Sequence, residues 1–242
     1  DAIAPRRPGS LGLQQPHVFI EAHGACGQVE LFGQVADGVG DGHTKIGGST
    51  DEHLRVANDQ NDAGKIYLKY DLSALPGPLF DAALKLEFDA DSIKKPVQLN
   101  IFGLKETSKE MNFGEDKLGV DWKSDELTWE NAPANLQQAG GQFNIRKNSG
   151  GGIDTKYADF IGIITINPKA PLGAFLRTPA LTEFFKRKHA SGLYTLILTA
   201  VEPGETFIKS RNAGKNMAPA LVLKLFEQET HELDVILARE LD

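Results

Sequence analysis

The sequence predicts an all-β fold, an antiparallel β-sandwich with one short helix. Stretches of alternating apolar and polar residues recur at intervals of roughly ten residues, with clusters of Gly, Pro, Asn and Asp between them. Glycine is frequent, with 25 residues, and methionine is rare, with 2, which favours many turns over a helical bundle. Only one stretch shows a convincing helical pattern.

The clearest alternation lies in residues 65–71, the second strand of an expected hairpin. Its two faces differ in character: Ile66, Leu68 and Tyr70 point one way, and Lys65, Tyr67 and Lys69 point the other. Residues 54–56 form the first strand, and the polar segment 58–64 forms the turn between them. This pattern predicts a sheet with one side in a core and the other offered to a ligand.

The remaining elements follow from the same kind of pattern. Further strands are expected at residues 83–89, 97–102, 161–166, 194–200, 205–211 and 218–226, and a first strand pair at 17–21 and 28–32. The glycine-rich residues 36–50 are expected to form a loop. A helix is expected at residues 179–189, because Thr178 can cap it, Pro179 suits its first position, and Leu181, Phe184 and Phe185 share one face.

Composition narrows the classes of function. The formal net charge of −7 argues against nucleic acid as the partner. The single cysteine, Cys26, allows no internal disulfide. No apolar run approaches the roughly 20 residues that span a membrane. We expect residues 1–16 to be a linker or chain edge, 17–226 to be one β-sandwich module, and 227–242 to be a C-terminal extension.

Several segments, taken in order, resemble the DNRLRE-type carbohydrate-binding modules, the family of β jelly rolls that includes alginate-binding modules (family ninety-six). The matching segments are 47–50 (GGST), 54–56 (LRV), 65–73 (KIYLKYDLS), 83–86 (ALKL), 126–133 (ELTWENAP), 207–214 (FIKSRNAG) and 219–222 (PALV). They cover about residues 35 to 226. Residues 136–160 are longer and less regular than the family's pattern, and Asn212 stands where an acidic residue is common.

The resemblance implies jelly-roll topology and a non-catalytic module of a larger multidomain protein, secreted or at the cell surface. Its partner would be an acidic polysaccharide, uronate or sulfated, such as alginate. Such a glycan needs cationic donors, and Arg can bind a carboxylate in bidentate fashion whereas Lys acts as a mobile point charge. The candidate ligand-binding residues are Arg55, Lys65, Tyr67, Lys69, Lys209, Arg211 and Trp122, the two aromatic residues as platforms for sugar rings.

Three alternatives stay open. A structural calcium site could use Asp37, Asp41 or Asp51 with backbone carbonyls. A polysaccharide lyase would need a paired acid and base, for which Tyr67 and His53 are the candidates. A structural or adhesion β-sandwich of a cell-surface protein would need no glycan site at all.

Overall fold

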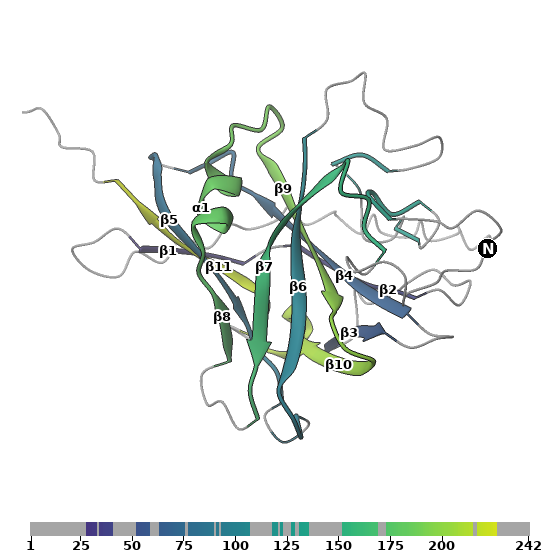
Figure 1. Cartoon of the computed structure of the whole chain (residues 1–242). Coiled ribbons are helices and arrows are strands. Elements are labelled where there is room, and N and C mark those ends of the chain that lie inside the picture. The colour runs from purple at the N-terminus through teal and green to yellow at the C-terminus, as the bar shows by residue number, and fades with distance from the viewer. Residues whose placement is uncertain are drawn as a thin grey trace, which may run out of the picture.

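The computed structural model describes two antiparallel β-sheets that face each other, with one helix (Figure 1). It describes residues 28–32, 34–40, 52–58, 63–75, 77–89, 91, 93–106, 118–120, 122, 127–128, 131–135, 152–168, 173–214 and 217–226. For residues 28–40, and for Ala63 and Arg211, only the backbone is described. The all-β sandwich with one short helix is therefore confirmed.

Four strands form the smaller sheet, in the order β1-β11-β5-β8. They are β1 (Gln28–Phe32), β5 (Leu79–Leu86), β8 (Ala174–Leu176) and β11 (Ala220–Leu225). The larger sheet has the order β10-β3-β4-β9-β6-β7, with β2 also paired to β4. Its strands are β2 (Gln34–Gly40), β3 (His53–Asn58), β4 (Ala63–Asp71), β6 (Val97–Leu104), β7 (Ala158–Ile166), β9 (Leu193–Ala200) and β10 (Gly204–Lys209).

Eight of these strands have the topology of a jelly roll. Along the chain β1, β5, β8 and β11 of the smaller sheet are interleaved with β4, β6, β7 and β9 of the larger one. Neighbours in each sheet are therefore mostly distant in sequence, as two Greek keys require. The strands β2, β3 and β10 widen the larger sheet beyond this frame.

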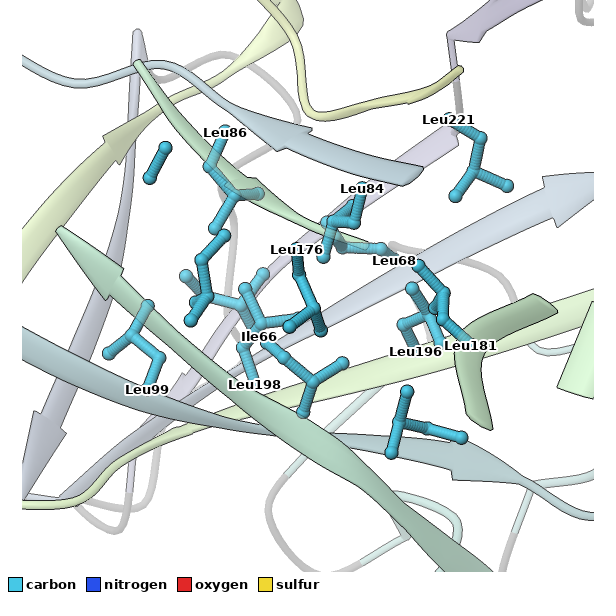
Figure 2. Packing of buried hydrophobic residues seen from close by; sticks show 14 of the residues in the cluster. Ile66, Leu68, Leu84, Leu86, Leu99, Leu176, Leu181, Leu196, Leu198 and Leu221 are labelled. Atoms are coloured by element: carbon cyan, nitrogen blue, oxygen red, sulfur yellow. The ribbon is translucent and has the colours of Figure 1, made fainter. Parts of the chain in front are cut away.

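The main core lies between the two sheets (Figure 2). It is built from alternate residues of facing strands: Ile66, Leu68, Leu99, Leu196 and Leu198 come from the larger sheet, and Leu84, Leu86, Leu176 and Leu221 come from the smaller. All nine are at most 5% exposed, so burial of apolar surface between the sheets is the main force that holds the sandwich together.

Helix α1 (Pro179–Lys186) adds its apolar face to this core and contacts β5 and β7. The Thr178 side chain accepts a hydrogen bond from the Leu181 backbone N–H at 3.1 Å, so the expected cap is confirmed. The helix ends at Lys186 and not at His189, because Arg187 leaves the helical conformation. Phe184 lies directly over Gly103 of β6, where a Cβ atom would come within 2.5 Å of the ring.

The structure differs from the expected strands in two details and leaves a third untested. Strands β3 and β4 form the expected hairpin only over Ala57 with Gly64 and Asn58 with Ala63; from Ile66 to Asp71 β4 pairs with β9, and its other edge pairs with β2. The residues 36–40, expected as loop, belong to β2. Residues 28–32 form β1 but pair with β11, and residues 17–21 lie outside the described part of the chain.

Candidate functional site

An exposed patch lies on the outer face of the strand pair β3–β10, at one edge of the larger sheet. Leu54, Val56 and Ile208 turn into the core, so the residues between them turn outward. Arg55 lies directly opposite Phe207 across the pair, and His53 lies opposite Lys209. Phe207 is 38% exposed and meets the His53 ring edge to face, with 6.5 Å between the ring centroids. Arg55 and Lys209 therefore lie next to an accessible aromatic residue on the same face.

Carboxylates hold the basic side chains of this patch in place. The Arg55 Nε donates to Glu205 Oε2 at 2.9 Å. Asp89, which follows β5, binds Lys209 Nζ through Oδ1 at 2.7 Å and His53 Nε2 through Oδ2 at 2.9 Å. These hydrogen bonds to Lys209 and His53 lower the pKa of Asp89, so its charge persists into acid. The patch thus combines oriented cations, hydrogen-bond acceptors and an aromatic face.

The outer face of β4 is different, because it is covered. Lys65, Tyr67 and Lys69 are 2%, 0% and 9% exposed, respectively. Lys65 Nζ donates to Asn135 Oδ1 at 2.5 Å and to the Gly152 carbonyl at 2.8 Å, and Lys69 Nζ donates to the Trp122 carbonyl. The expectation of an open basic face on this strand is wrong: both ammonium groups are bound to segments of the connection between β6 and β7.

The cover over β4 has a hydrophobic core of its own. Its buried members are Tyr67, Phe102, Leu104, Trp122, Leu127, Ala132, Ala134, Ile153, Ala158 and Ile197. The Tyr67 hydroxyl donates to the Pro133 carbonyl at 3.2 Å, and Trp122 Nε1 donates to Thr195 Oγ1 at 3.1 Å. The two rings meet edge to face at 6.3 Å, and Lys69 Nζ lies 4.7 Å from the Trp122 ring centroid. We refer to this group as the second core.

Tyr67 and Trp122 therefore pack inside the second core and stabilise the cover over β4. Burial raises the pKa of the Tyr67 phenol, so this group stays protonated. The Tyr67 hydroxyl and the His53 ring, the acid–base pair that a lyase would need, make their hydrogen bonds to different partners, Pro133 and Asp89. The structure describes both side chains and shows no hydrogen bond between the Tyr67 hydroxyl and the His53 ring.

For the remaining expected residues, Arg211, Asp37, Asp41 and Asp51, the structure describes the backbone at most. Arg211 is not on a strand, because β10 ends at Lys209 and Arg211 begins a short 3-10 helix, η2 (Arg211–Ala213). Asp37 lies on β2 without a described side chain, and Asp41 and Asp51 lie outside the described residues. Among the side chains that are described, no group of three or more His, Cys, Asp or Glu could hold a metal ion.

Sequence reasoning found Arg55 and Lys209 but missed their neighbours. His53, Phe207 and Asp89 belong to the patch because β3, β10 and the chain after β5 meet at one edge of the sandwich. The alternation in residues 205–209 puts Phe207 on the outward face with Glu205 and Lys209, which is the signal that could have identified it. No sequence signal connects Asp89 to residue 209.

Comparisons with known proteins give no family for this chain. A scan against protein-family models finds no match, and a search of curated proteins finds none either. The resemblance to DNRLRE-type carbohydrate-binding modules thus stays a prediction from the ordered segments. The described part of the chain contains no helix with the length and apolar character to span a membrane.

Proposed function

We propose that this protein is a non-catalytic module that binds an acidic polysaccharide, such as alginate, on the outer face of β3–β10. The single observation that carries this proposal is that Arg55 lies directly opposite Phe207, an exposed aromatic ring, with Lys209 two positions along β10 on the same face. Such a ring can lie against the apolar face of a sugar, while the guanidinium and ammonium groups donate to its carboxylates.

The carboxylates of the patch are compatible with this ligand. Glu205 and Asp89 orient the cations, and they can accept hydrogen bonds from sugar hydroxyls. The Arg55 Nε donates to Glu205, which orients the guanidinium on the outer face. The ligand surface thus differs from the one expected from β4, because Lys65 and Lys69 bind the cover.

Affinity electrophoresis in gels that contain alginate tests the proposal. The protein should be retarded at low salt and less so at high salt, because exposed ion pairs are screened. The double variant Arg55→Ala/Lys209→Ala should lose about tenfold or more in affinity, since a hydrogen bond to a charged group contributes about 1.5–3 kcal/mol.

A matched control separates the site from net charge. The double variant Lys186→Ala/Arg187→Ala also removes two exposed cations, which pair with Glu183 and Asp159 near the end of α1. It should be retarded like the unaltered protein. Equal loss in both double variants would point to non-specific charge attraction, and no retardation of the unaltered protein at low salt would overturn the proposed function.

A further inference from the structure

We infer that the ligand surface continues from β3–β10 onto the smaller sheet as far as Phe175, and that it takes a uronate chain of several sugars. This inference rests on the proposed function and extends it to a longer site. Phe175 of β8 is 53% exposed and lies directly opposite Lys85 of β5. It is a second accessible aromatic ring.

The chain after β5 connects Phe175 to the β3–β10 patch. Leu84, Leu86 and Phe88 turn into the main core, so Lys85, Glu87 and Asp89 all turn outward. Lys85 Nζ binds Glu87 Oε1 at 2.9 Å, and Asp89 binds Lys209 and His53 as described above.

A backbone hydrogen bond connects the two sheets next to this outward row. The Lys209 N–H donates to the Glu87 carbonyl at 2.8 Å, so the middle of the outward row and the end of β10 are held side by side. Strand pairing joins Phe175 to Lys85, and ion pairs and a backbone hydrogen bond join Lys85, Glu87 and Asp89 to the patch around Phe207. We call this row of residues the edge strip.

The length and charge of the edge strip define its ligand. An extended chain rises about 3.3 Å per residue, so the four residue steps from Lys85 to Asp89 can span up to about 13 Å, more than a single sugar ring can cover. The three cations of the strip are each paired with a carboxylate: Lys85 with Glu87, Lys209 with Asp89 and Arg55 with Glu205.

The equal number of cations and carboxylates in the edge strip favours a uronate chain over a sulfated one. A uronate chain has one carboxylate and several hydroxyls on each sugar, so it can bind the cations and also donate to the three carboxylates. A densely sulfated chain offers fewer hydroxyls and is repelled by those carboxylates. The inferred ligand is therefore a uronate oligosaccharide or polysaccharide, with a ring stacked at Phe207 and another at Phe175.

Binding constants for uronate oligosaccharides of increasing length test the inference. Affinity should rise with length until the strip is covered. Phe175→Ser should weaken binding of long chains about two- to tenfold, the range expected for one aromatic contact, and leave the affinity for the shortest binding chain unchanged. A sulfated glycan of equal length should bind more weakly than the uronate.

Phe80→Ser is the matched control. Phe80 is 54% exposed on the same strand as Lys85 but makes its ring contact with Phe226, outside the strip. It should bind chains of every length like the unaltered protein. Thermal unfolding of both variants checks that each is folded.

The outcomes separate the two proposals. If Phe175→Ser and Phe80→Ser bind all lengths alike while Arg55→Ala/Lys209→Ala loses binding, the extension is overturned and the proposed function stands. If the double variant binds like the unaltered protein while Phe175→Ser is weakened, the β3–β10 site is wrong. Tighter binding of the sulfated chain would overturn the assignment to uronates.

Discussion

The outer faces of β4 and of β3–β10 have the same kind of sequence but different environments. Both place basic side chains beside an aromatic one, Lys65, Tyr67 and Lys69 on β4 and Arg55, Phe207 and Lys209 on β3–β10. On β4, Lys65, Tyr67 and Lys69 are buried beneath the connection between β6 and β7, whereas Phe207 is 38% exposed. The difference teaches that alternation predicts which face leaves the main core, but not whether that face meets solvent.

The position of each strand explains the difference. Strand β4 lies inside the larger sheet, with β9 on one side and β2 on the other, and the connection between β6 and β7 folds back over it. Among the described strands, β10 is at the edge of the same sheet and has β3 as its one partner. The lysine stems on β4 cover apolar surface while their ammonium groups reach backbone carbonyls of the cover.

The largest expected contrast comes from removing an aromatic ring on each face. Trp122→Ala should lower the free energy of unfolding by about 3–5 kcal/mol, because it empties the centre of the second core. Phe207→Ala should change it by about 0.5 kcal/mol or less, as an exposed side chain does. Denaturant unfolding of the two variants measures this. Similar losses would mean that the two faces are equally buried.

Removal of one cation from each face should give a smaller contrast. Lys65→Met keeps most of the apolar stem but leaves Asn135 Oδ1 and the Gly152 carbonyl without this donor, which should cost about 1–3 kcal/mol. Arg55→Ala breaks an exposed ion pair with Glu205 and should cost about 0.2–1 kcal/mol. The measurement is the same unfolding titration at neutral pH. A Lys65→Met protein as stable as the unaltered one would show that the cover does not depend on this ammonium group.

The smallest expected effect is the pH dependence of the open face. Lys209 and His53 lower the pKa of Asp89 in the folded protein, so Asp89 binds its proton more weakly there than in the unfolded chain. Its stabilising effect is therefore present above the ordinary aspartate pKa and is lost as pH falls through the lowered value. Unfolding curves of Asp89→Asn and the unaltered protein should thus differ at neutral pH and converge in acid. A difference that grows in acid would contradict the assignment.

The fold was predictable because its signals are local. Alternation in residues 65–71 and 83–89 indicates which side of the chain faces the main core, and Thr178 with Pro179 marks a helix start wherever the helix lies. Strands β2 and β8 were missed, because β2 contains two glycines, Gly38 and Gly40, and β8 has only 3 residues.

The candidate site was predictable only in part. The sequence alone determined that Arg55 and Lys209 lie outward on strands, since a period of two needs no knowledge of neighbours. Tertiary structure decided that β3 pairs with β10, that Asp89 reaches Lys209 from 120 positions earlier in the chain (209 − 89), and that residues after β6 cover Lys65 and Lys69. These contacts depend on the order of strands in a sheet and the path of a long connection, which non-local packing determines and local alternation does not encode.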